Sequence, residues 1–384
     1  MRPLLTLLLA ALLVPGSARA AAPVKLGIIN SVTGPEAPIG ENLTGGYKLA
    51  EEDLKARGTP VELVWEDDTG KPQIAMGAME KLATRDRVAA VVGPYTSASS
   101  NATAKRAEQY KVPLVIPAAS KEEITKQGLK WVFRVSATTD DYAAILLDMA
   151  LSVGKPRTIA IVNENTDFGV SAAKSARALS EKRGLKVVAE EAYSKGSPDY
   201  RSTLTKVKSA SPDLVFMVSY VADAILLMRQ SREIGLSPQA FLGAGAGFAT
   251  VQFASERDVS NGVFSSTQWT DDVKWPGAKA FFDRYKKRFG KEPTYHAACA
   301  YVSLLIAAEA ASQAGGDREK TRAALDQGSW NGIMGQVKFV DGNGYTNQNR
   351  HPMLAEQVQQ GRQVTVYPPD LASAKPIWPF PGWR

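Results

Sequence analysis

The chain has 384 residues, of which 44% are hydrophobic and 22% charged, and its formal net charge is +7. This length exceeds what one hydrophobic core usually supports, so we expect two domains of ordinary size. The mild positive charge is spread beside acidic residues, as in Glu51-Glu52-Asp53-Leu54-Lys55. This pattern excludes the concentrated basic stripe that nucleic acid requires.

The N-terminus predicts a cleaved secretory signal peptide over residues 1–20. Arg2 supplies a positive charge, the apolar run 4–14 is short for a membrane span, and Ala18-Arg19-Ala20 matches a small-x-small cleavage site. A buried N-terminal helix is the alternative, but the run lacks amphipathic spacing. We therefore expect a mature protein that is free and soluble outside the cytoplasm.

Strands and helices then alternate with short connections, which is typical of parallel sheets covered by helices on both faces. The first unit has expected strands at 24–30, 61–66, 89–93 and 113–116, with helices at 41–56, 72–84 and 97–110. The second unit has expected helices at 140–153, 169–183, 200–209 and 222–234.

The strands of the first unit return in the second. Three pairs correspond, namely 24–30 with 157–163, 61–66 with 187–191, and 89–93 with 213–217. Two similar α/β units imply two lobes that face each other, and a gap between two lobes can hold a small molecule.

The remaining segments fit no third repeat. Helices at 275–289 and 296–314 are expected to pack on the first unit, and two short strands follow at 353–358 and 363–366. The Pro- and Trp-rich tail cannot be helical, so we expect it to lie extended along a lobe surface.

The predicted fold is α/β, with two similar lobes that each contain a doubly wound, mostly parallel sheet. Lobe 1 is expected to comprise 21–138 plus 268–345, and lobe 2 to comprise 139–267 plus 346–384. Three hinge crossings are expected near 136–140, 265–270 and 341–350. Gly342 and Gly344 would absorb backbone rotation in the third crossing.

A catalytic interpretation finds little support. The chain has two histidines, His296 and His351, and one cysteine, Cys299, which cannot form an intramolecular disulfide. No pair has metal-ligand spacing, and no Gly-x-Ser-x-Gly elbow accompanies the histidines. The glycines of 243–247 lack the Lys of a phosphate loop. We therefore expect no enzyme, no metal and no cofactor.

Two strand-to-helix turns are rich in hydroxyl groups. Residues 94–101 follow one strand and 118–120 follow its neighbour. In open parallel sheets ligands collect at the carboxyl ends of the strands, and helix N-termini suit a carboxylate. Each Ser or Thr taken singly is more often a helix cap. Two such turns on neighbouring strands favour anion binding.

The chain resembles the type I periplasmic solute-binding proteins of the leucine/isoleucine/valine-binding family, the receptors of ABC importers for amino acids and related compounds. The resemblance covers nearly the whole mature chain. Six segments carry it together, namely 26–46 (LGIINSVTGPEAPIGENLTGG), 91–101, 113–125 (PLVIPAASKEEIT), Phe133-Arg134, 199–204 and 212–219.

The resemblance implies roles for individual residues. Ile39 would cover the ligand from the first lobe, and His296 stands at a position that is often aromatic. Ser97 and Ser120 would bind the ligand carboxylate, and the Ala119 carbonyl would meet its ammonium. Phe168 and Tyr220 would close from the second lobe. From the residues alone, Phe168 and Tyr220 could instead be lobe core, and His296 a helix cap.

One position departs from the family. The acid that normally pairs with the ligand ammonium aligns with Gly245. Burying an unpaired ammonium is expensive, so either Asp140, Asp141 or Asp223 substitutes, or the ligand is not an α-amino acid. The family's first-lobe disulfide is also absent, and its positions fall near Gly70 and Thr96.

The leading hypothesis is therefore a binding protein with no chemistry of its own. It would capture an amino acid or an aromatic or aliphatic carboxylate, act as a monomer, and deliver the solute to an inner-membrane ABC permease. A sensor module for a signalling partner is the first alternative. A secreted hydrolase is the second.

Overall fold

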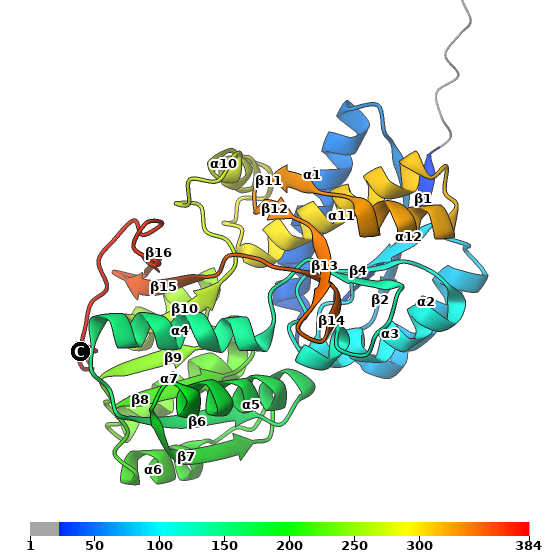
Figure 1. Ribbon diagram of the computed structural model, residues 1–384. Coiled ribbons are helices and arrows are strands. Elements are labelled where there is room, and N and C mark those ends of the chain that lie inside the picture. Colours follow the sequence, from blue (N-terminus) through cyan, green and yellow to red (C-terminus); the bar gives the residue numbers. More distant parts are fainter. Residues whose placement is uncertain (1–22, 384) are drawn as a thin grey trace, which may run out of the picture.

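The computed structural model describes residues 23–383. The predicted signal peptide lies outside this range. Two lobes are visible in Figure 1, with the first lobe at the upper right and the second at the lower left. Among the described residues, no helix combines the length and apolar character needed to cross a membrane.

Each lobe is built on a seven-stranded sheet. In the first lobe the strand order is β13 (Phe339–Gly342), β14 (Tyr345–Asn349), β5 (Val132–Arg134), β4 (Leu114–Ile116), β3 (Ala90–Val92), β1 (Val24–Asn30) and β2 (Val61–Asp67). In the second lobe it is β16 (Arg362–Tyr367), β15 (Leu354–Gln359), β10 (Phe264–Thr267), β9 (Ala240–Gly243), β8 (Leu214–Val218), β6 (Thr158–Glu164) and β7 (Lys186–Tyr193).

The two sheets contain the same arrangement of five parallel strands. The order β2-β1-β3-β4-β5 repeats as β7-β6-β8-β9-β10, which confirms the repeat expected from the sequence. The edges differ, because β14 adds parallel to β5 whereas β15 adds antiparallel to β10. The strands β1, β3, β6 and β8 are apolar and buried, as strands covered on both faces must be.

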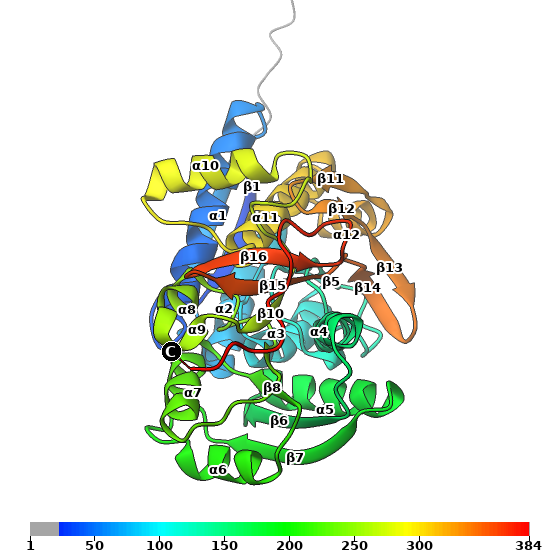
Figure 2. The same cartoon turned by 90° about the vertical axis from the view of Figure 1, so that its left-hand side faces the viewer.

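Helices cover both sheets (Figures 1 and 2). Those of the first lobe are α1 (Ala37–Ala56), α2 (Pro72–Thr84), α3 (Ser97–Tyr110), α10 (Ala278–Phe289), α11 (Tyr295–Gln313) and α12 (Arg318–Gln327), with the 3₁₀ turn η1 (Glu122–Ile124). Those of the second are α4 (Thr139–Val153), α5 (Asp167–Lys182), α6 (Arg201–Ser209), α7 (Val221–Glu233), α8 (Val251–Ser255) and α9 (Arg257–Ser260).

Helix α11 is the buried centre of the first lobe, as its apolar sequence predicts. It packs closely against α1 because Gly46 carries no side chain. A Cβ at Gly46 would lie 2.2 Å from the Ala297 carbonyl oxygen. Helix α12 and the small hairpin of β11 (Trp330–Gly332) and β12 (Gly335–Val337) were not predicted.

Three crossings join the lobes, and the third differs from the prediction. The chain crosses after β5, after β10 and after β14. Because β14 pairs with β5, the first lobe continues to Asn349 rather than ending at 345. Gly342 and Gly344 lie at the turn of the β13–β14 hairpin, inside the first lobe. They are therefore not part of a crossing.

Side-chain amides tie the crossings together. Gln268 accepts a hydrogen bond from the Ala137 N–H (2.7 Å), which joins the second crossing to the first. Asn349 donates to the Val135 carbonyl (2.9 Å), which joins the third crossing to the end of β5. Hydrogen bonds thus connect the three crossings into one hinge.

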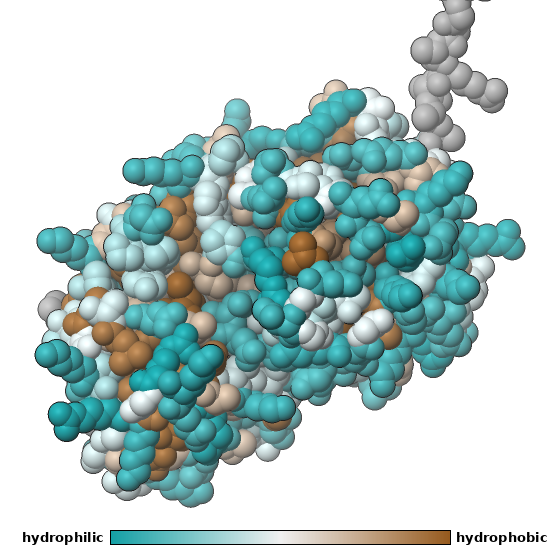
Figure 3. Space-filling view, viewed as in Figure 1, coloured by the Kyte–Doolittle hydropathy of each residue, from teal (hydrophilic) through white to brown (hydrophobic). Residues whose placement is uncertain are grey.

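The tail lies extended on the second lobe, as expected. Trp383 and Phe380 pack on the Phe241 ring, and the Trp383 indole N–H donates to the Leu236 carbonyl (2.9 Å). Figure 3 shows a face of the molecule that is largely hydrophilic, with hydrophobic residues in small patches.

Candidate functional site

All eight residues singled out in the sequence are buried where the two lobes meet. They lie beyond the carboxyl ends of the central strands or at the start of α1, α3, α5 and α11. Those of the first lobe are Ile39, Ser97, Ala119, Ser120 and His296, and those of the second are Phe168, Tyr220 and Gly245.

Aromatic rings connect the lobes in a continuous chain. Tyr95 contacts His296 edge-on (centroids 5.4 Å apart) and also contacts Tyr220 of the second lobe (6.0 Å). Tyr220 in turn contacts Phe168 (5.6 Å). We call these four residues the aromatic cluster. Tyr95 was not chosen from the sequence, although it lies in the hydroxyl-rich turn that carries Ser97.

Ser97 opens helix α3 and keeps a hydroxyl proton to donate. Thr96 caps the helix by accepting the Ser99 N–H (3.1 Å). The Ser97 hydroxyl oxygen accepts the Lys121 N–H (3.3 Å), so its own proton is free for an anion. The partial positive charge of the helix N-terminus favours the same kind of ligand.

The Ala119 carbonyl is already occupied by donors from its own lobe. It accepts hydrogen bonds from the Ser136 hydroxyl (3.1 Å) and from the guanidinium of the wholly buried Arg134 (3.4 Å). A carbonyl oxygen has two lone pairs, so both are used. The role expected for Ala119, to receive a ligand ammonium, therefore conflicts with its surroundings.

The space beside Gly245 is filled by an aromatic ring. The backbone at Gly245 has φ +53°, and a Cβ there would lie 2.8 Å from a ring carbon of Tyr142. The Tyr142 hydroxyl accepts from Gln268 (2.7 Å) and lies 3.4 Å from the Tyr295 hydroxyl. A network of neutral groups thus stands where relatives are expected to carry an acid.

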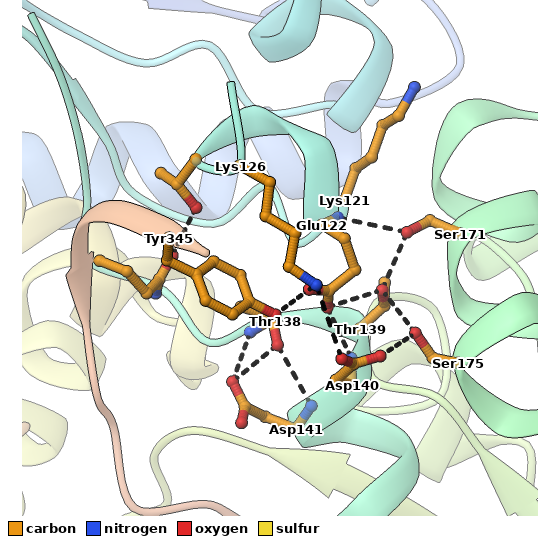
Figure 4. Close-up of polar contacts among 12 residues, drawn as sticks. Lys121, Glu122, Lys126, Thr138, Thr139, Asp140, Asp141, Ser171, Ser175 and Tyr345 are labelled. Atoms are coloured by element: carbon orange, nitrogen blue, oxygen red, sulfur yellow. Dashed lines mark hydrogen bonds and ion pairs between the residues drawn. The ribbon is translucent and has the colours of Figure 1, made fainter. Parts of the chain in front are cut away.

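The aspartates that could replace this acid are engaged elsewhere (Figure 4). Asp140 accepts from the Ser175 hydroxyl (2.6 Å), and Asp141 closes a capping box with Thr138 at the start of α4. Asp223 accepts the Gly196 N–H (3.0 Å). None of the three is held at Gly245.

The sequence does not predict an ion pair that joins the lobes, in which the acid is buried and the lysine is partly exposed. The Lys195 ammonium of the second lobe binds Glu36 of the first, and it lies 4.2 Å from the centre of the Tyr220 ring. Burial raises the pKa of Glu36, and the charge of Lys195 opposes part of this rise. The pair therefore joins the lobes next to Tyr220 of the aromatic cluster.

Glu164 is a second buried acid next to the cluster. It accepts from the Thr166 hydroxyl (2.5 Å) and from the Tyr220 N–H (3.1 Å). Burial raises its pKa to about 7, while these donors and Lys195 act in the opposite direction. Glu164 therefore supports Tyr220 with a carboxyl group that is partly protonated at neutral pH.

A second set of polar contacts closes the lobes beside the hinge (Figure 4). The Glu122 N–H donates to the Ser171 hydroxyl (3.2 Å), and Lys121 forms an ion pair with Asp167 (2.6 Å). The Thr139 hydroxyl of the second lobe donates to the Glu122 carboxylate of the first (3.2 Å). The lobes are therefore in direct contact at these residues as well as at the Glu36–Lys195 pair.

The side chains of the described residues form no metal site. Residues 23–383 contain no group of three or more His, Cys, Asp or Glu side chains arranged to hold a metal ion. Burial lowers the pKa of His296 to about 3, so its ring is neutral at physiological pH. What the site can do chemically is bind, by hydrogen bonds and aromatic contact.

Comparison with known proteins identifies the class of protein that this fold and site define. The family model described as periplasmic binding protein matches residues 23–363. Leu/Ile/Val-binding protein homolog 7 of Brucella suis biovar 1 (strain 1330) is 31% identical over 397 residues, covering 97% of this chain and 98% of the relative. The chain belongs to the periplasmic binding protein family.

Solved structures share the fold. The leucine binding protein LivK of Thermotoga maritima superposes with a TM-score of 0.81 and 26% identity, covering 90% of this chain and 99% of its own. A solute binding protein of an ABC transporter from Rhodopseudomonas palustris BisB5, in complex with 3,4-dihydroxybenzoic acid, gives 0.79 and 24%, covering 88% and 94%. The family and the relatives that the chain matches are binding proteins and not enzymes.

Proposed function

We propose that this protein is the periplasmic substrate-binding component of an ABC importer, and that it captures a small carboxylate in the aromatic cluster between its lobes. Ser97 and Ser120 hold the carboxylate, and Ile39, Phe168, Tyr220 and His296 surround the body of the solute. The protein acts as a monomer, closes about the hinge, and delivers the solute to a membrane permease. Membership of the family and the relatives' own roles support this proposal.

The fold leaves two ligand classes open. One protein of this fold is a leucine binding protein, and another was solved with 3,4-dihydroxybenzoic acid. The choice between them depends on what meets an α-ammonium. A leucine-type ligand needs a carboxylate and free carbonyl oxygens in a dry cleft, because a buried unpaired ammonium is costly.

We propose that the solute is a carboxylate without an α-amino group. The observation that carries this proposal is the Tyr142 ring, one carbon of which lies 2.8 Å from the position of a Cβ added at Gly245. The two hydrogen bonds already made to the Ala119 carbonyl favour the same conclusion. Glu36 already has its cation in Lys195.

Calorimetry with L-leucine, its deaminated counterpart 4-methylpentanoate, and benzoate tests the ligand class. We expect the acids to bind and L-leucine to give no response. The methyl ester of a bound acid should not bind, since it lacks the anion. Tight leucine binding without a response to either acid would overturn the ligand class and restore an amino-acid receptor.

A further inference from the structure

The hydrogen bonds around His296 determine which of its nitrogens carries the proton. The Asn42 side-chain oxygen accepts the N–H groups of Thr294 (3.3 Å) and Ala297 (3.1 Å), which fixes that atom as the oxygen. The Thr294 hydroxyl oxygen lies 2.9 Å from it. Two oxygens at this distance need a hydrogen between them, and only the Thr294 hydroxyl can supply one.

The Thr294 oxygen can therefore only accept from His296. The Nδ1 atom of His296 lies 3.0 Å from that oxygen, so Nδ1 carries the hydrogen. The ring is wholly buried and neutral, and a neutral imidazole has one N–H. The Nε2 atom consequently carries no hydrogen and has a free lone pair. It is buried and has no hydrogen-bond partner within residues 23–383.

A second unpartnered polar atom lies in the same cluster. The Tyr95 hydroxyl is buried and also has no partner in the described part of the chain. The rings of Tyr95 and His296 are in edge contact, and Tyr95 belongs to the turn that carries Ser97. Buried polar groups are nearly always hydrogen-bonded, and leaving one unpaired is costly. Two such atoms in a site between lobes point to a polar group of the ligand.

Because Nε2 carries no hydrogen, it can only accept a hydrogen bond, and this determines which polar group of the ligand fits there. A lone pair repels a carboxylate, so the carboxylate belongs at Ser97 and Ser120 rather than at His296. An ammonium would donate to Nε2 but would remain without a counter-charge at Gly245. A neutral hydroxyl donates a hydrogen bond and brings no charge.

We propose that the solute is a hydroxy acid, whose hydroxyl group donates to His296 Nε2 and lies against the Tyr95 hydroxyl while its carboxylate is held by Ser97 and Ser120. This inference rests on the proposed function and names the ligand more closely. It makes His296 and Tyr95 the residues that separate a hydroxy acid from the corresponding plain acid.

Two ligand series test the inference by calorimetry. The first keeps one carbon skeleton and changes one substituent, with 2-hydroxy-4-methylpentanoate, 4-methylpentanoate and L-leucine. The second uses 4-hydroxybenzoate, benzoate and 4-methoxybenzoate, in which the methoxy group has no proton to donate. We expect a hydroxy acid of at least one series to bind about tenfold or more tightly than its partners without the donor.

A matched pair of variants assigns the preference to one ring. His296→Phe keeps an aromatic ring against Tyr95 but removes the acceptor, so the preference should fall to within about twofold. His351→Phe alters an equally buried histidine that packs on Trp275 instead. It should leave the preference intact.

Nitrogen-15 spectra give a readout that needs no ligand. The chain has two histidines, so His296→Phe assigns the signals. We expect a protonated Nδ1 and a bare Nε2 in the free protein, and a change at Nε2 when a hydroxy acid binds. A protonated Nε2 would overturn the inference.

The outcomes separate this inference from the proposed function. Equal affinity for hydroxylated and plain acids means that ordered water satisfies Nε2, which overturns the inference and leaves the carboxylate receptor standing. Binding of L-leucine alone overturns both the ligand class and the inference.

Discussion

Ser97 combines a helix N-terminus with a hydroxyl whose proton is unused. Its oxygen accepts the Lys121 N–H, so the serine and the loop after β4 are held in one arrangement. The Ser120 carbonyl accepts the Thr139 N–H (2.9 Å), which ties the neighbouring turn to the start of α4. Ser97 is thus held to the loop that follows Ser120, and Ser120 is held to the first crossing between the lobes.

Removing the Ser97 hydroxyl should weaken carboxylate binding. A hydrogen bond to a charged group contributes about 1.5–3 kcal/mol, so Ser97→Ala should lower affinity for a carboxylate about tenfold or more. The melting temperature of the free protein should change little. Ser209→Ala, on an exposed helix of the second lobe, is the control. Unchanged affinity in Ser97→Ala would remove this serine from the site.

Sequence reasoning places several candidate residues in recognisable turns, and their role in ligand binding stays a prediction. Ser97, Ser120, Phe168 and Tyr220 each follow a strand of the repeat, so their meeting between the lobes was predictable. The pairing of Glu36 with Lys195 was not, because it joins two loops far apart in sequence across the lobe interface. No local pattern marks a lysine that points at an acid of another lobe.

At the scale of elements, the loop after β9 defines one wall of the site. The sequence places Gly245 where the family carries an acid, and the structure shows why a side chain does not fit there. The backbone is left-handed there and Tyr142 of α4 lies against it.

The position of the third crossing differs from the prediction because of two other glycines. Gly342 and Gly344 indicate a flexible turn, but sequence does not say whether that turn joins lobes or closes a hairpin.

A side chain at Gly245 should therefore destabilise the protein. Gly245→Ala places a Cβ in a left-handed backbone, which costs about 1–2 kcal/mol, and overpacks against Tyr142, which costs about 1–3 kcal/mol more. Gly58→Ala has the first cost alone, because its φ is +74° and nothing lies within 4 Å of the added Cβ. Denaturant unfolding measures both. Equal losses would show that the Tyr142 ring moves aside.

At the scale of the whole molecule, the Glu36–Lys195 pair links the lobes across the aromatic cluster. Lys195→Met should leave Glu36 buried without a cation and so disfavour the closed arrangement. Breaking a fully buried pair costs about 3–5 kcal/mol, and the partial exposure of Lys195 reduces this figure. We expect ligand affinity to fall about tenfold. In small-angle scattering, contraction on ligand addition should need correspondingly more ligand.

A double variant separates charge from packing. Glu36→Gln combined with Lys195→Met removes both charges, so no unpaired ion is buried and affinity should recover in part. Lys206→Met breaks an exposed pair with Glu191 inside the second lobe and should change neither affinity nor contraction. An unchanged radius of the wild-type protein at saturating ligand would count against hinge closure itself.

The pH dependence of stability is set by buried groups that act in opposite directions. Burial lowers the pKa of His296 to about 3 and of His351 to about 4, from an ordinary 6.5. The unfolded chain therefore binds protons first, and stability is lost as pH falls below 6.5. Burial raises the pKa of Glu164 to about 7 and of Glu356 to about 8, from 4.5. Here the folded chain keeps its protons, and stability is lost as pH rises from 4.5 towards 8.

Single variants should expose each contribution. Glu356 lies on β15 and accepts from the Ser265 hydroxyl (2.8 Å). Glu356→Gln removes a group whose contribution to stability declines as pH rises. The free energy of unfolding of the variant should therefore rise relative to that of the wild type by about 1.4 kcal/mol per pH unit between 4.5 and 8. His296→Phe should show the opposite trend, because its free energy of unfolding should rise relative to that of the wild type as pH falls below 6.5. Urea unfolding at pH 5, 6, 7 and 8 measures both differences. A constant difference for Glu356→Gln across this range would mean that the folded protein ionises Glu356 like the unfolded chain.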